Sequence, residues 1–148
     1  SRWKARITEE KTFRRVKMRE IKFRARLDKK SFPKSHSKGW VYGFVSKYKG
    51  DWSMDTYGNY GGFVANGSYL AIDPETIGQY TGLTDKNGKE LYFNDYIHVY
   101  FGGKYNKTVP IKDIYDLSNL IRLIEDHGAT FKIYGNAYDN PELLEGAN

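Results

Sequence analysis

The stretch from Ile77 to Leu91 constrains the fold more than any other part of the chain. It reads Ile-Gly-Gln-Tyr-Thr-Gly-Leu-Thr-Asp-Lys-Asn-Gly-Lys-Glu-Leu, which is two short segments on either side of an Asp-Lys-Asn-Gly sequence. An Asp side chain at the start of a turn accepts hydrogen bonds from nearby backbone N–H groups, and Gly adopts the left-handed conformation at little cost. We therefore predict a hairpin whose turn is held by Asp85 and in which Gly88 has a positive φ.

Two ligand-binding interpretations of this stretch fail on spacing. A phosphate-binding P-loop has four residues between its first Gly and the Gly-Lys-Ser/Thr sequence. Here five residues separate Gly82 from Gly88, and Glu90 stands where the hydroxyl residue is required. A calcium loop that began at Asp85 would place Lys89, a cation, at its fifth position, where an oxygen ligand is needed. The stretch therefore predicts a turn without a bound phosphate or calcium.

A second strong pattern follows Met18, where apolar and basic residues alternate. The apolar members are Ile21, Phe23, Ala25 and Leu27, and the basic members between them are Lys22, Arg24 and Arg26. This period of two predicts a strand with one buried face and one strongly basic face. Tyr and Trp side chains nearby offer surfaces on which bases can stack. Our candidate contacts to a nucleic acid or to an acidic partner are therefore Arg19, Lys22, Arg24 and Arg26.

The distribution of charge leaves both kinds of partner open. The net charge of the chain is +6, but residues 18–49 carry a net charge of +8 and residues 50–148 carry −7. The acidic part, in the same chain or in a neighbouring copy, therefore competes with nucleic acid for the basic segment. If nucleic acid binds there, phosphate contacts should dominate and the affinity should fall steeply with salt.

Residues 1–17 have the character of a basic, flexible extension. They hold seven basic and two acidic residues, and their large apolar residues are too sparse to require a core. Arg14 and Arg15 precede Met18 at the distance at which AGG-AGG codons would form a bacterial ribosome-binding site before a start codon. We therefore expect Met18 to be the natural start and 18–148 to be the domain. Other Arg codons at these two positions would contradict this hypothesis.

The rest of the chain predicts short strands, tight turns and one helix. Thirteen Tyr, eight Phe and fifteen Gly in 148 residues favour strands and turns over long helices. Phe63 to Ile72 predicts a hairpin that turns at an Asn-Gly pair. Ile114 to His127 has the apolar period of an amphipathic helix. Asp116 or Ser118 is expected to cap its start, and Gly128 to end it. We predict a β-rich α+β fold of antiparallel hairpins, partly barrel-like, with one C-terminal amphipathic helix.

Three separated strings occur in the order and spacing of one known family. They are Met18 to Ala25, Ile77 to Tyr92, and Tyr134 to Leu144. Together they resemble the YopX family of phage and prophage proteins, over residues 18–145. Family members often carry Glu-Gly-Asp-Ile-Val after the central hairpin, and here Asp95 and Ile97 match that string in kind. The resemblance implies a bacteriophage origin and self-association, and it brings no catalytic residues with it.

The residues needed for common catalytic and metal-binding chemistry are missing or isolated. The chain has no Cys, which excludes disulfides, Cys-ligated zinc, iron–sulfur clusters and thiol nucleophiles. The spacing of His36, His98 and His127 forms no metal motif, and no Ser-containing nucleophile elbow is present. We therefore predict a protein with no catalytic residues, no bound metal and no cofactor.

These observations lead to two functional hypotheses. The first is a non-enzymatic bacteriophage accessory protein that acts by self-association, as a homo-oligomer, or by binding a host or phage macromolecule. The alternative, which we favour less, is a nucleic-acid-binding module that uses the basic N-terminal third. No run approaches the eighteen apolar residues of a membrane-spanning helix, so we expect no membrane contact and a place in the cytoplasm of the infected bacterium.

Overall fold

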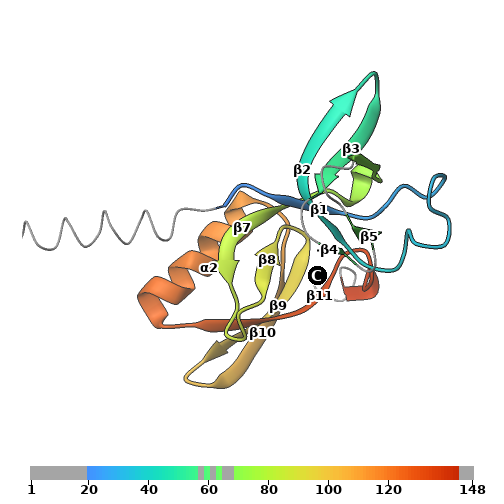
Figure 1. Cartoon of the computed structure of the whole chain (residues 1–148). Helices are drawn as coiled ribbons and strands as arrows, with labels where there is room; N and C mark the ends of the chain where they lie inside the picture. Colours follow the sequence, from blue (N-terminus) through green and yellow to red (C-terminus); the bar gives the residue numbers. More distant parts are fainter. Residues whose placement is uncertain (1–19, 57–58, 61–62, 65–68, 144–148) are drawn as a thin grey trace, which may run out of the picture.

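The described part of the protein is an antiparallel β structure with one long helix. The computed structural model describes residues 20–56, 59–60, 63–64 and 69–143 (Figure 1). Candidate residue Arg19 and the predicted extension 1–17 lie outside the described residues. The described strands form a six-stranded sheet, a three-stranded sheet and a two-stranded ribbon. The predicted β-rich α+β class is confirmed.

The larger sheet has the strand order β6-β3-β2-β1-β7-β8, and a short 3-10 helix, η1 (Pro74–Thr76), lies between β6 and β7. Its strands are β1 (Phe23–Ala25), β2 (Val41–Tyr48), β3 (Asp51–Thr56), β6 (Tyr69–Ala71), β7 (Gly78–Thr84) and β8 (Glu90–Tyr92). Just beyond β1 and β6, Leu27 forms an antiparallel bridge with Ile72. This bridge curls the sheet around an apolar core that includes Ala25, Val41 and Met54. The curl gives the partly barrel-like shape predicted from the sequence, and the sheet stays open.

The predicted hairpin between Phe63 and Ile72 is wrong in its pairing. Strand β5 (Phe63–Val64) pairs with β4 (Asn59–Tyr60), whereas β6 pairs with β3. Strand β3 is already fixed in the sheet by β2, so it offers β6 a longer and more rigid partner. In this register Leu70 lies opposite the buried Met54, and both contribute to the core. The burial of these apolar side chains therefore decides the pairing of β6, and the predicted Asn-Gly turn itself lies outside the described residues.

The smaller sheet has the order β10-β9-β11 and is covered on one face by helix α2 (Figure 1). Its elements are β9 (Asp95–Phe101), β10 (Lys104–Ile111), α2 (Ile114–His127) and β11 (Thr130–Asn136). Leu117 and Leu120 of the helix pack against Ile97, Val99 and Phe131. The helix has the bounds predicted from the sequence, because the apolar stripe that indicated it is the face that packs on the sheet.

The caps of α2 are partly those expected from the sequence. The N-cap is Asp113, and not Asp116 or Ser118. Asp113 has an extended backbone and accepts from the N–H groups of Tyr115 and Asp116, while the Asp116 carboxylate accepts from the Asp113 N–H. This reciprocal capping box uses Asp116 as its third helical residue and not as the cap. Gly128 ends the helix with φ 65°, as predicted.

The central turn between β7 and β8 forms as predicted and also joins the two sheets. Asp85 Oδ1 accepts hydrogen bonds from the N–H groups of Asn87 and Lys89, at 2.9 Å each, and Gly88 has φ 82°. Asp85 Oδ2 accepts a third bond, at 3.0 Å, from the N–H of Ile133 in β11. Burial raises the energy of the charged carboxylate, but these three donors outweigh it and lower the pKa of Asp85.

We predict that Asp85→Ala lowers the free energy of unfolding by about 3 kcal/mol, because three backbone donors lose one charged acceptor. Urea unfolding at neutral pH measures this loss. In the parent protein the folded-state pKa lies below the unfolded one, so the contribution is present above the ordinary carboxyl range. It is lost as pH falls through the lower folded pKa. An Asp85→Ala variant as stable as the parent would contradict this account of the turn.

Candidate functional site

The predicted basic strand face is buried and not solvent-facing. Arg24 and Arg26 are each 4% exposed, so both faces of β1 and its extension are covered. The predicted strand has its apolar and basic residues on opposite faces, but the basic face is buried as well. Acidic residues distant in sequence fold over the arginines and neutralise them, which makes the burial of two guanidinium groups tolerable.

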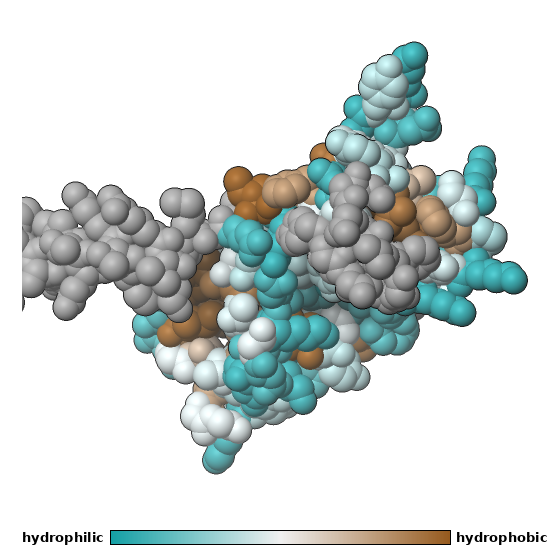
Figure 2. All heavy atoms as spheres, in the orientation of Figure 1, coloured by the Kyte–Doolittle hydropathy of each residue, from teal (hydrophilic) through white to brown (hydrophobic). Residues whose placement is uncertain are grey.

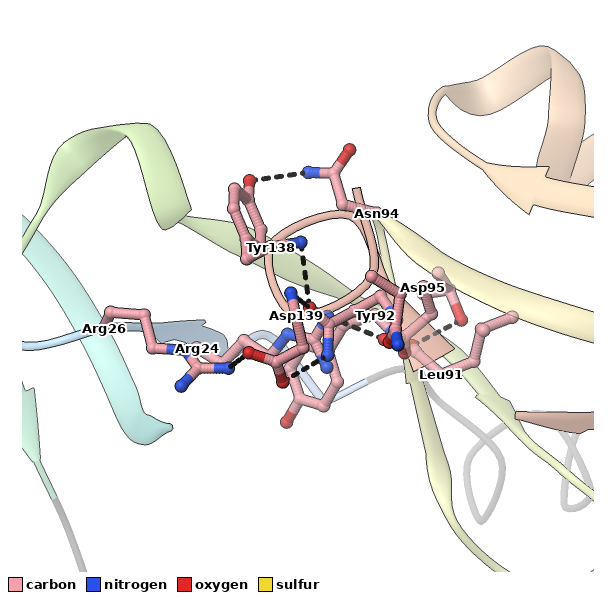
Figure 3. A network of polar contacts seen from close by, with 11 residues as sticks. Arg24, Arg26, Leu91, Tyr92, Asn94, Asp95, Tyr138 and Asp139 are labelled. Atoms are coloured by element: carbon pink, nitrogen blue, oxygen red, sulfur yellow. Dashed lines mark hydrogen bonds and ion pairs between the residues drawn. The ribbon is translucent and has the colours of Figure 1, made fainter. Parts of the chain in front are cut away.

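Arg24 is paired with Asp95, the first residue of β9. The Arg24 Nη2 and Asp95 Oδ1 atoms are 2.7 Å apart, and Asp95 is 1% exposed. The second carboxylate oxygen of Asp95 accepts the N–H of Tyr92 at 2.8 Å. Burial raises the pKa of Asp95, and the Arg24 guanidinium limits that rise. This pair connects the middle of the larger sheet to the start of the smaller one (Figure 3).

Arg26 is paired with Asp139, in the turn after β11. Its Nη2 lies 2.7 Å from Asp139 Oδ1, and its Nη1 donates to the carbonyl oxygen of Ser37 at 2.9 Å (Figure 3). Burial disfavours the charged form of Asp139, but hydrogen bonds from Asn136 and Arg26 outweigh it and lower the pKa of the carboxyl group. A third segment of the chain is thereby fixed to the strand.

Aromatic rings contact both guanidinium groups. The Trp40 ring lies 4.0 Å from the Arg24 guanidinium carbon and 4.2 Å from that of Arg26. The Tyr92 ring lies 4.9 Å from Arg24. Such contacts are favourable when the cation is removed from water. The aromatic residues that suggested base stacking therefore stack on the chain's own arginines.

Lys22 is the most accessible of the described candidate residues, and it is also paired. Its Nζ lies 2.5 Å from a Glu90 oxygen and 3.2 Å from a Glu20 oxygen. Burial lowers the pKa of Lys22, but the two carboxylates outweigh it and raise the pKa above its ordinary value. Lys22, Arg24 and Arg26 therefore each face an acidic partner in the same chain.

A cavity of about 250 Å³ opens beside the Arg24 pair. Trp40, Tyr42 and Tyr92 contribute aromatic walls, and Lys89 and Glu90 also line it. The Nε atom of Arg24 is buried and has no hydrogen-bond partner among the described residues. The lining holds two cationic groups, Arg24 and Lys89, and two carboxylates, Glu90 and Asp95, so the cavity has no excess of either charge with which to select an ionic ligand.

A second, polar cavity of about 350 Å³ brings His36 together with Asp73, Glu75 and Asp139. His36 Nδ1 lies 2.6 Å from the Leu27 carbonyl oxygen, which fixes the ring, and Nε2 lies 4.0 Å from an Asp73 oxygen. Asp73 also caps η1, and Asp139 holds Arg26. Two of the three carboxylates are therefore already used as structural acceptors, which argues against an acid–base pair here.

The described residues also bear on metals and membranes. Within the described ranges, no group of three or more His, Asp or Glu side chains is placed to hold a metal ion. None of the described helices is long and apolar enough to cross a membrane.

Sequence reasoning missed the acidic partners Asp95 and Asp139, although both lie in strings that carried the family resemblance or adjoined them. Asp95 follows Asn94, which has φ 78° and occupies the Gly position of the Gly-Asp pair common in the family. Asn tolerates this left-handed conformation better than most residues do. Asp139 lies in the closing string. The sequence signal that could have indicated them is the presence of isolated acidic residues in these strings, because the alternating arginines need carboxylate partners if they are buried.

We predict that Asp95→Asn lowers the free energy of unfolding by about 3 kcal/mol, because it leaves the Arg24 charge buried without a counter-charge. The matched change Asp139→Asn should cost less, because Asp139 is half-exposed, so water already screens the pair, and Arg26 keeps its bond to the Ser37 carbonyl oxygen. Urea unfolding of both variants at pH 7 measures the difference. Equal losses would contradict the assignment of Arg24–Asp95 as the dominant pair.

Comparisons with known proteins agree with the resemblance found in the sequence. The family model described as YopX protein matches residues 12–145, starting inside the predicted extension. No curated protein and no solved structure matches the chain. The match covers nearly the whole sequence, including the strings that carry Asp95 and Asp139. The chain belongs to the YopX family.

Proposed function

We propose that this phage-related protein acts without catalysing a reaction, by associating with further copies of itself. The roles of the buried carboxylates support the part of this proposal that concerns catalysis, because these groups pair with arginines, cap turns and accept hydrogen bonds from backbone N–H groups. The charges that could have joined one copy to the next, on Lys22, Arg24 and Arg26, are paired within the chain. Association must therefore use another surface.

The hairpin of β2 and β3 is the surface that fits best. It extends away from the rest of the molecule, and its tip is white and teal in the hydropathy view (Figures 1 and 2). The start of β2 is anchored in the core by Val41, and the rest of the strand becomes progressively exposed. A hairpin extended in this way presents its side chains to a neighbouring molecule.

An aromatic strip on one face of this hairpin is the observation that carries the proposal. Phe44 is 51% exposed, Tyr48 is 72% exposed, and Tyr69 on the adjacent strand β6 is 68% exposed. Phe44 and Tyr69 both lie next to Asp55 in the register, so they share one face. Tyr48 lies four residues after Phe44 on β2, so its ring is on the same face. Exposed aromatic side chains are enriched at the centres of protein interfaces, where they contribute most of the binding energy.

The other functions expected from the sequence have less support. Nucleic-acid binding through Arg19, Lys22, Arg24 and Arg26 would require three of these residues to leave their acidic partners. A host or phage protein could bind the same aromatic strip in place of a second copy of the chain. The compartment that we propose is the cytoplasm of the infected cell.

We predict that the parent protein is oligomeric and that the double variant Phe44→Ser, Tyr48→Ser shifts it toward the monomer. Removing two aromatic anchors should weaken association at least about tenfold. Light scattering after size exclusion, at about 0.1 M and about 1 M NaCl, measures the mass, and an aromatic contact should persist at the higher salt.

The matched control is Tyr115→Ser, which removes an exposed Tyr from helix α2 and should leave the mass unchanged. A parent protein that is monomeric at both salt concentrations would contradict the proposal. So would a double variant that remains as oligomeric as the control.

A further inference from the structure

The outer face of the three-stranded sheet carries aromatic and basic side chains that lie outside the apolar core. Ile97, Val99 and Phe131 point toward helix α2. Because side chains alternate along a strand, their neighbours lie on the opposite face. The residues of this aromatic–lysine face are His98 and Tyr100 on β9, Tyr105 on β10, and Lys132 and Tyr134 on β11.

The register of the sheet brings these side chains together. Tyr105 lies opposite Tyr100, and Lys132 lies opposite His98. The His98 ring centroid is 5.2 Å from that of Tyr105 and 4.2 Å from that of Tyr134. Tyr105 and Tyr134 are each 56% exposed. Two open rings therefore flank one imidazole.

A groove of about 460 Å³ runs along this face, lined by His98, Tyr105 and Tyr134 and by residues 106–108 of β10. The Nε2 atom of His98 is buried in its floor and has no hydrogen-bond partner among the described residues. Buried polar atoms are normally paired, so an unpaired one in an open groove indicates a place for a ligand atom. A neutral imidazole can donate or accept there, as a base edge requires.

The charged side chains near the groove are mostly basic, although residues 50–148 carry a net charge of −7 and Glu142 lies near Tyr96 of β9. Lys107 lines the groove and Lys132 lies opposite His98, whereas Lys104 lies opposite Phe101, toward the side covered by α2. Strands β10 and β11 contain no acidic residue. The Lys86 ammonium group lies 3.9 Å from the centre of the Tyr100 ring, at the same face. The one acidic residue of β9, Asp95, is buried against Arg24.

We infer that the aromatic–lysine face binds single-stranded nucleic acid, a function beyond the proposed self-association. Bases would stack on Tyr105 and Tyr134, with one base edge at His98 Nε2, while the lysines contact phosphates. Stacking on aromatic rings within a basic groove is the general way in which proteins bind single strands. A paired duplex hides its base faces, so it could use the lysines but not the rings.

A second copy of the chain is a poorer occupant of this face. In a two-fold dimer the same surface meets itself, so Lys107 and Lys132 of one copy would approach the lysines of the other. Like charges brought together at an interface cost energy. Phosphates supply the opposite charge, and the bases of a single strand supply flat groups on which the two rings can stack.

Fluorescence anisotropy of the full chain with labelled oligothymidine of about 15 nucleotides tests this inference. At about 0.1 M salt we expect binding that weakens as salt rises. Tyr105→Ala and Tyr134→Ala should each lower the affinity about 5- to 100-fold. Lys132→Gln should weaken binding and reduce the salt dependence by about one counterion. A duplex of the same length should bind more weakly and should not respond to the Tyr changes.

Two control variants lie away from this face: Tyr115→Ala on α2 and Lys38→Gln in the loop before β2. Both should bind as the parent does. Absence of binding would overturn the inference, and so would equal binding by all variants, which is expected if residues 1–17 attract the strand by charge alone. Loss of oligomers in the Tyr105 and Tyr134 variants would show instead that a second copy covers the face. Thermal unfolding of each variant shows whether it is folded.

Discussion

The structure depends on the burial of Arg24 against Asp95. A guanidinium and a carboxylate both removed from water are costly unless each is fully matched, and here the match comes from a 2.7 Å contact, a backbone N–H and two stacked rings. The pair links β1 of one sheet to β9 of the other. Arg26 and Lys22 repeat this arrangement with Asp139 and Glu90, so one short strand collects acidic residues from three later segments. In this region, basic side chains of the first third therefore pair with acidic side chains of the remainder of the same chain.

This internal use of charge changes where function can be sought. The alternating arginines looked like a binding surface because charged residues are usually exposed, yet they hold the two sheets together. The surfaces that remain are aromatic: the strip of Phe44, Tyr48 and Tyr69 on the larger sheet, and the aromatic–lysine face on the smaller one. The first has Lys49 beside Tyr48 and Asp55 between Phe44 and Tyr69, and this mixed surface suits another protein surface. The second carries Lys86 beside Tyr100 and Lys132 opposite His98, and it suits a polyanion with flat bases.

Local chemistry was enough to predict much of the fold. The turn at Asp85 and Gly88, the helix from Ile114 to His127 and its Gly128 stop each depend on a few neighbouring residues. The sequence could not show which strand β6 would join, because that choice depends on burying Leu70 against Met54. Nor could it show that Asp95, 71 residues from Arg24, would meet it. The aromatic–lysine face was missed because its members lie on three strands whose register only the fold sets.

The central claim is that Arg24 and Asp95 act as one energetic unit, and a double-mutant cycle tests it most directly. The cycle compares Arg24→Met, Asp95→Leu and the double variant by urea unfolding at pH 7. Each single change leaves one buried charge unmatched, whereas the double change leaves none, so the two losses should be strongly non-additive, with a coupling energy of about 2 kcal/mol or more. A coupling energy near zero would contradict the account, because it would mean that the two charges are stabilised independently.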